Sequence, residues 1–317
     1  MTRCTSSHAR RCSTHWNATI LVGAQAVYLH TGPVNLPVAE QTTDADLALH
    51  PEMLADAPLL ADAMTSRNFV PHKDQIGRWI IKKKIGDKEI EVMADLLVPE
   101  ALGGAGSRGA RLGVHGKRVA RKAKGLEAAL VDKSVMKVEA LDGIDPRSFE
   151  VSIAGPGALL VAKMHKIGER IGQDGRVKDK DGLDVLRLLR AIPADVMSAR
   201  LKMLAGDKLA GPVTKEAIDI FERHFRKPEG EGAQMAARAL SHVELMDTTP
   251  GQGIPGSVHL SVRFSASGAT SSDVSIVEPR VRGPSSRPDG AVRFRKKPEL
   301  PQKESDACRA SHHSKTL

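Results

Sequence analysis

The sequence predicts an α+β fold, in which a mixed β-sheet with helices is followed by a C-terminal helical region and a disordered tail. Short apolar, β-branched runs separated by turns predict an α/β domain over residues 17–155. Apolar residues with helical spacing predict a helical domain over residues 156–227. Residues 246–317 are rich in Ser, Pro and Gly and cannot bury a core, so we expect disorder there and in residues 1–16.

The formal net charge of +9 lies mostly at the two ends of the chain. Residues 1–16 contribute +3 and residues 246–317 contribute +4, so that the remaining body carries only +2. A nearly neutral body excludes an argument for nucleic-acid binding from the overall charge alone. All three cysteines also lie at the ends, so neither a disulfide framework nor a cysteine zinc site is expected to hold the body.

The first predicted element of the body is a strand at residues 18–22, which Gly23 turns into a helix. The same apolar run after Arg10 and Arg11 is similar to a signal peptide. We favour a buried strand, because the run leads directly towards an acidic motif, and we expect a cytoplasmic protein. No stretch contains the roughly 18 consecutive apolar residues of a membrane span, so no membrane association is expected.

A loop at residues 31–41, with Gly and Pro, precedes a second strand at residues 44–49 that begins with an Asp-x-Asp motif. Alternate side chains of a strand point to the same face, so Asp44 and Asp46 should project together. Adjacent like charges cost free energy unless a cation neutralises them. The motif therefore indicates metal-assisted phosphoryl chemistry, and an ordinary Asp-rich surface turn is the alternative.

A helix at residues 51–66 and two strands at residues 78–82 and 89–98 come next, with Gly86-Asp87 as the turn between the strands. The second of these strands contains a lone carboxylate, Asp95, among apolar residues. A buried charge is costly unless it is paired or binds a metal. Asp95 is therefore a third candidate metal ligand.

Residues 108–125 form a basic segment with several glycines and no acidic residue. Seven cations lie in it: Arg108, Arg111, Lys117, Arg118, Arg121, Lys122 and Lys124. Such a segment suits contact with the phosphate backbone of a nucleic-acid acceptor, and a solvated loop is the alternative. Three β segments are predicted after it, at residues 126–131, 135–141 and 149–153.

Helices are predicted at residues 157–167, from Asp181 onwards, at 194–204 and at 213–225. Lys163, Lys166 and Arg170 share one helical face. We interpret Lys163 as functional because it lies in an apolar run, and Lys166 as part of a solvated face. Two roles remain open for Asp181 and Asp184, one at the start of a helix and one in catalysis. His30 and His165 are interpreted as core or supporting residues.

The order of these motifs resembles the polymerase-beta-type nucleotidyltransferase fold, and in particular the AbiEii-like abortive-infection nucleotidyltransferases, whose members include toxins of toxin–antitoxin pairs. The likeness spans roughly residues 18–225. It is carried by residues 22–27, 42–47, 95–98, 157–166, Arg170, 178–181 and Asp184.

The resemblance implies transfer of a nucleoside monophosphate from an NTP to a hydroxyl acceptor such as RNA, tRNA or protein, with the helical domain completing the cleft. It implies two Mg²⁺ ions on Asp44, Asp46 and Asp95, and a catalytic role for these residues and Lys163. It assigns the nucleotide to Gly23, Ala24, Lys163, Arg170, Lys178 and Lys180. Residues 108–125 would contact an RNA acceptor, and an antitoxin protein would be a partner.

Two departures from the family pattern favour other functions. The second residue of the turn is Ala24 rather than Gly or Ser, and the loop before Asp44 lacks the Arg often found there. One alternative is a catalytically weakened nucleotide-binding or interaction protein on the same fold. The other is a nucleic-acid-binding protein that uses residues 108–125.

Overall fold

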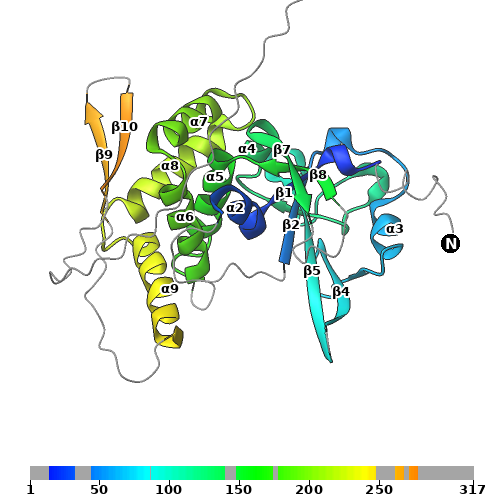
Figure 1. Ribbon diagram of the computed structural model, residues 1–317. Coiled ribbons are helices and arrows are strands. Elements are labelled where there is room, and N and C mark those ends of the chain that lie inside the picture. The colour runs from blue at the N-terminus through cyan, green and yellow to red at the C-terminus, as the bar shows by residue number, and fades with distance from the viewer. Residues whose placement is uncertain are drawn as a thin grey trace, which may run out of the picture. The chain divides into compact units, whose positions relative to one another are not determined.

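A central mixed sheet organises the protein, as the computed structural model in Figure 1 shows. The structure describes residues 14–32, 44–85, 87–139, 148–173, 178–247, 261–267 and 271–277. The sheet has the order β3-β4-β5-β2-β1-β8-β7, and β6 pairs with β5. Its strands are β1 (Thr19–Val22), β2 (Asp44–Leu49), β3 (Val70–Pro71), β4 (Arg78–Ile85), β5 (Lys88–Pro99), β6 (Arg121–Ala123), β7 (Lys133–Glu139) and β8 (Ser148–Ala154).

Strand pairing brings the acidic residues of two strands together. β1 is antiparallel to β2, and β2 is parallel to β5. The register places Asp46 directly opposite Asp95 and Asp44 opposite Met93. Residues directly opposite each other in a sheet project to the same face. The predicted strands at residues 18–22 and 44–49 are confirmed, and their neighbour β5 carries the third carboxylate onto their face.

Helices of very different length surround the sheet. The short ones are η1 (Trp16–Ala18), η2 (Pro51–Met53), α3 (Leu60–Thr65), η3 (Glu100–Leu102), η4 (Gly113–His115) and α4 (Glu127–Val131). The longer ones are α2 (Gly23–Thr31), α5 (Pro156–Gly168), α6 (Asp179–Ala191), α7 (Ala194–Gly206), α8 (Gly211–Phe225) and α9 (Glu231–Asp247). None of the helices that the structure describes has the length and apolar character needed to cross a bilayer.

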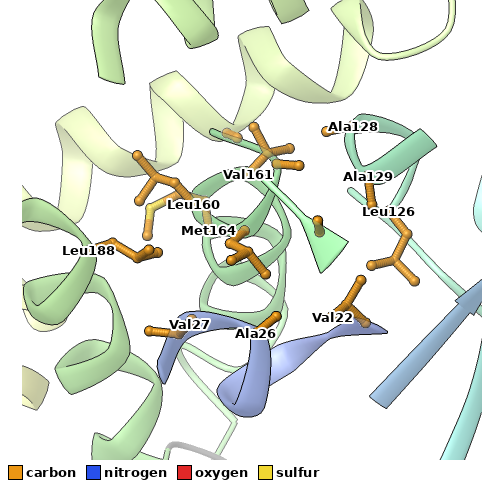
Figure 2. Close-up of a cluster of buried hydrophobic side chains, with 14 of the residues drawn as sticks. Val22, Ala26, Val27, Leu126, Ala128, Ala129, Leu160, Val161, Met164 and Leu188 are labelled. Atoms are coloured by element: carbon orange, nitrogen blue, oxygen red, sulfur yellow. The ribbon is translucent and has the colours of Figure 1, made fainter. Parts of the chain in front are cut away.

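The main core joins the sheet to the helices. Ile20 and Val22 of β1 pack in one cluster with Val161 and Met164 of α5 and Leu188 of α6. Figure 2 shows this cluster, in which α2 also contributes. The predicted α/β and helical domains therefore share one continuous core, and the chain up to Pro279 forms one compact unit. A second, smaller cluster lies around Trp79.

Two predicted elements are wrong. Residues 51–66 do not form one helix: η2 ends at Met53 and α3 begins at Leu60, because Pro58 removes a helix donor and its ring blocks a continuous helix. Residues 126–131 form helix α4 with its N-cap residue Leu126, rather than a strand. Their Leu, Glu and Ala are strong helix formers, and the sequence pattern of a short apolar run does not distinguish the two.

The C-terminal part contains elements that composition did not predict. Helix α9 extends into residues 246–317, and β9 (Ser261–Ser267) pairs antiparallel with β10 (Ser271–Val277). Apolar residues alternate in both strands, which is the period-2 signal that the Ser-rich composition obscures. Most of the N-terminal segment, the loop beyond Gly32, the three cysteines and the rest of the tail lie outside the described residues.

Candidate functional site

A strongly basic cavity of about 610 Å³ lies where β1, β2, β6 and α5 meet. Three acidic side chains line it: Asp46, Glu100 and Glu169. The cationic side chains in its lining are Arg108, Arg121, Lys122, Lys124, Lys163, Lys166 and Arg170. The excess of positive charge suits an anionic ligand with several charges, such as a polyphosphate.

The turn from β1 into α2 forms one wall of the cavity at Gly23. This glycine has a φ of 71°, a conformation that side chains rarely tolerate. A Cβ atom there would overlap the Asp46 carboxylate, because Val22 pairs directly with Asp46 in the sheet. Gly23 thus allows bare backbone to approach Asp46, while Ala24 follows inside the helix and is half-buried.

Of the three candidate metal ligands Asp44, Asp46 and Asp95, Asp46 is the one in the cavity lining. Burial raises the pKa of Asp46 above its usual range, and the negative charge of Asp95 adds to this effect. The positive charges of Lys166, Lys163 and Arg121 act in the opposite direction. A carboxylate that is desolvated in this way gains from a bound cation, which is typical of functional sites.

Asp95 is held by two arginines. Arg78 donates from Nε to Oδ1 and from Nη2 to Oδ2, both at 2.8 Å, and Arg121 donates from Nη2 to Oδ2 at 2.6 Å. Burial alone would raise the pKa of Asp95, but the hydrogen bonds and charges of the two arginines outweigh it and lower the pKa. Both carboxylate oxygens are therefore engaged.

Arg78 is a site residue that our reading of the sequence missed, although a signal for it exists. Ile85 pairs with Lys88 at the closed end of the β4–β5 hairpin, and the register that follows sets Arg78 opposite Asp95. The partnership could therefore be predicted once the turn was recognised. Arg121 comes from β6, and no local pattern relates it to Asp95.

The carboxylates only partly fit a two-magnesium site. Asp44 and Asp46 share a strand face and offer the hard oxygens that Mg²⁺ prefers. Asp95 lies on the same face, but the arginines occupy its oxygens. Within the described part of the chain, no three acidic, His or Cys side chains are arranged to hold a metal. The donor chemistry fits magnesium, whereas the complete set of three carboxylates does not fit as arranged.

Lys163 is a buried part of the cavity lining, only 5% exposed, and its Nζ lies between two carboxylates of α6. Its Nζ donates to Asp181 Oδ1 at 2.9 Å and to Asp184 Oδ2 at 2.5 Å. Burial alone would lower the pKa of Lys163, but Asp184 and Asp181 outweigh it and raise the pKa. Lys178 is the N-cap residue of α6, and Asp181 lies in the first turn of this helix, as one of its two open roles implies. Asp181 and Asp184 are also both buried partners of Lys163, and nothing tests a catalytic role for either.

Three cations on one face of α5 and the turn after it converge on Asp181. Besides Lys163, Lys166 Nζ lies 3.0 Å from Asp181 Oδ1, and Arg170 Nη1 donates to Oδ2 at 2.6 Å. The shared face predicted from their spacing is confirmed. Burial would raise the pKa of Asp181, but Lys163 and Lys166 outweigh it and hold the pKa well below its usual range.

Lys166 fits the sequence interpretation in part. Its side chain is 40% exposed, as expected for a solvated face, but the solvent that it meets is that of the cavity beside Asp46. Partial desolvation together with the charge of Lys163 lowers its pKa. Lys166 lies on the side of α5 that borders both the cavity and α6. The helical period of the sequence alone does not distinguish this side from one that faces bulk solvent. Lys178 and Lys180 are exposed and are not part of the cavity lining, so their assigned contact with a nucleotide stays a prediction.

The basic segment supplies the opposite wall. Four of its predicted cations, Arg108, Arg121, Lys122 and Lys124, line the cavity, whereas the other three do not. Lys122 Nζ is fixed by the carbonyl oxygens of Gly104 and Gly106, each at 3.0 Å. The segment therefore contributes to the same site as the acidic motif.

The two histidines have structural partners. His165 is buried, and its Nε2 lies 2.8 Å from the carbonyl oxygen of Val213. His30 Nε2 lies 2.8 Å from the carbonyl oxygen of Ala154. Both contacts fit the predicted core or supporting role.

In comparisons of sequence, the chain matches neither a model of a known protein family nor a curated protein.

Proposed function

We propose that the protein is a nucleotidyltransferase that moves a nucleoside monophosphate from an NTP to a hydroxyl acceptor and releases pyrophosphate. One observation carries the proposal: a single cavity combines a glycine turn, the Asp46 carboxylate and seven cationic side chains. A triphosphate needs dense positive charge and bare backbone that can approach its oxygens. The resemblance to AbiEii-like nucleotidyltransferases points to the same chemistry.

The cations of α5 and of the turn after it would act on the phosphates in two ways, by direct contact and from within the cavity wall. Lys166 and Arg170 share Asp181 as a partner, and each keeps further N–H donors for a phosphate oxygen. Lys163 Nζ is enclosed by Asp181 and Asp184. It would therefore act by holding Asp181 in place and by adding positive charge to the cavity wall. Gly23 would present backbone to the phosphates.

The carboxylates would act on the metal and the acceptor. Asp44 and Asp46 would hold two Mg²⁺ ions, which when bound would neutralise charge on the transferred phosphoryl group. Asp95 would complete the coordination of the ion beside the acceptor hydroxyl only after an arginine gives up its hydrogen bond to this carboxylate. Asp95 would also accept the proton of the attacking hydroxyl. While Arg78 and Arg121 hold it, its lowered pKa makes it a weak base.

Calorimetry with a non-hydrolysable NTP analogue and Mg²⁺ tests the proposed site. We expect one nucleotide per chain, and we expect Lys166→Ala to weaken binding by at least about tenfold, since a hydrogen bond to a charged group contributes about 1.5–3 kcal/mol. Lys215→Ala is the matched control, because Lys215 is exposed on α8 and outside the cavity lining, and it should bind as the wild type does. Absence of binding for all nucleotides would exclude the proposal.

A second candidate function is a catalytically weakened nucleotide-binding or toxin–antitoxin interaction protein on the same fold. The engaged oxygens of Asp95 and the presence of Ala24 favour it. The same resemblance gives an antitoxin as its partner and the cytoplasm as its compartment. Binding of NTP without transfer to any acceptor pool would support this candidate over the enzyme.

The exposed basic segment also favours a nucleic-acid contact, either for an RNA acceptor or as the main activity. Arg108 and Lys117 of residues 108–125 are exposed. Binding through phosphate contacts weakens steeply with salt. A flat salt dependence of RNA binding, or unchanged binding in Arg108→Gln, would argue against this role.

A further inference from the structure

The two arginines that hold Asp95 are not equivalent. Arg78 binds both oxygens of Asp95 in parallel, whereas Arg121 makes one hydrogen bond, to Oδ2. Arg121 lines the basic cavity and Arg78 does not. The side chains of Arg78 and Arg121 are about equally exposed, at 22% and 20%, while the Asp95 side chain is only 3% exposed. Arg121 is therefore the partner that a cavity ligand can reach.

The structure also shows what would remain if Arg121 moved. Arg78 would keep Asp95 in a bidentate pair, so the buried carboxylate would not be left without a counter-charge. A buried charge left without any partner is strongly destabilising, and the second arginine avoids that cost. Release of Arg121 alone is thus energetically accessible.

We propose that Arg121 is an exchangeable cover on Asp95, which leaves Oδ2 when a phosphate group enters the cavity and so opens this carboxylate to a cation shared with Asp46. Naming the anion as the polyphosphate of an NTP rests on the proposed function. Guanidinium binds phosphate as readily as carboxylate, because its planar donors match both. Arg78 Nη2 would still donate to Oδ2, so the departure of Arg121 frees one acceptor position of this oxygen and not the whole carboxylate. Asp46 lies directly opposite Asp95 in the sheet, so that position belongs to the face that carries Asp46.

The exchange couples two ligands at one site. An anion that draws Arg121 away strengthens cation binding at Asp95 and Asp46, and by linkage the cation strengthens anion binding. The protein would therefore assemble its full carboxylate set only in the presence of a phosphate-bearing ligand.

Titration of the full-length protein with Mn²⁺, followed by the electron paramagnetic resonance signal of free Mn²⁺, tests the cover without any nucleotide. We expect Arg121→Gln to bind Mn²⁺ about tenfold more tightly than the wild type, the size of effect typical of groups that support a metal site. Arg108→Gln is the control, since it removes one charge from the same cavity lining without a contact to Asp95. Equal affinity in Arg121→Gln and Arg108→Gln would overturn the proposal.

A second measurement reports the movement directly. On addition of inorganic tripolyphosphate without metal to the wild type, we expect the ¹⁵Nε resonance of Arg121 to shift. The ¹⁵Nε resonance of Arg78 should stay unchanged. Arg121→Lys keeps the charge and serves if Arg121→Gln does not fold; it should bind Mn²⁺ with intermediate affinity. An unperturbed Arg121 signal with bound tripolyphosphate would contradict the exchange.

The outcomes separate this inference from the proposed function. If Arg121→Gln binds Mn²⁺ more tightly but the wild type transfers no NMP from any NTP, the role of Arg121 is supported and the proposed nucleotidyltransferase activity is excluded. If the wild type transfers NMP but Arg121→Gln gains no Mn²⁺ affinity, the activity is supported and the role of Arg121 is excluded.

Discussion

At the residue scale, the tightest packing in the site is that of the Gly23 backbone against the Asp46 carboxylate. A glycine at positive φ ends β1, and the absence of its side chain lets the turn lie against the carboxylate. The site is therefore built from a backbone feature as much as from charged groups. Sequence alone indicated the glycine turn and Asp46, but their direct contact follows from the pairing of Val22 with Asp46.

Gly23→Ala should disrupt both stability and transfer. We expect a loss of about 1–2 kcal/mol in the free energy of unfolding from the left-handed backbone alone, and displacement of Asp46 by the new Cβ atom. Urea unfolding and an NTP transfer assay measure the two effects. Gly32→Ala is the control, because Gly32 also has positive φ but its Cβ would meet nothing within 4 Å, so it should lose stability and keep transfer.

Lys163→Met should strongly destabilise the protein at neutral pH. It leaves Asp181 and Asp184 buried without their shared partner, and breaking a buried ion pair costs about 3–5 kcal/mol. Lys215→Met, at an exposed position of α8, should change stability by less than about 0.5 kcal/mol.

The effect of Lys163→Met should also depend on pH. The folded pKa of Asp181 lies below its unfolded value of about 3.9, so its contribution to stability is complete above that value and is lost as the pH falls. We expect the difference between variant and wild type to be smaller in urea unfolding at pH 3 than at pH 7. An unchanged difference would show that the ion pairs are not its source.

At the element scale, α5 is the helix that positions the cations, and its start depends on Asp132. The Asp132 carboxylate accepts a hydrogen bond from the backbone N–H of Ala158 at 3.1 Å and pairs with Arg200 of α7. Gly155 is required here, because a Cβ atom would overlap the carboxylate. Lys163 and Lys166 follow on the same helix, so Asp132 fixes where these cations begin.

Asp132→Ala should reduce the free energy of unfolding by about 0.5–2 kcal/mol, the range for loss of a helix cap. Amide hydrogen exchange should rise in the first turn of α5 before it rises elsewhere. Asp195→Ala is a fair comparison, because Asp195 is an exposed acid in the first turn of α7. Equal exchange rates in α5 for wild type and Asp132→Ala would show that the cap does not hold this helix.

The elements also show which parts were predictable from sequence. Strand β2 and helix α5 have a strong period or a clear breaker at each end, and their predicted ranges agree with the structure. Residues 126–131 form α4 because tertiary contacts decide between helix and strand in so short a run: Glu127 accepts the N–H groups of Ala101 and Gly125. Such contacts between distant segments have no local signal.

At the scale of the whole molecule, the cavity gathers segments that are far apart in the chain. Val22 and Gly23, Asp46, residues 106–108 and 121–126, and α5 all contribute to its lining. The individual motifs could be recognised in the sequence. That the basic segment and the acidic motif line the same cavity could not be predicted, because it arises from the parallel pairing of β6 with β5. The central claim is therefore that this cavity is a site of nucleotidyl transfer.

Transfer of label from α-³²P NTPs to a mixed pool of RNA and protein acceptors, with Mg²⁺, tests that claim most directly. The account predicts labelled acceptor and stoichiometric pyrophosphate with the wild type, and a loss of at least about 100-fold in Asp46→Asn, as for removal of one strong electrostatic group from an active site. Asp56→Asn makes the same chemical change at an exposed position outside the cavity lining and should retain wild-type transfer. No transfer by the wild type with any of the four nucleotides, or equal transfer by Asp46→Asn, would contradict it.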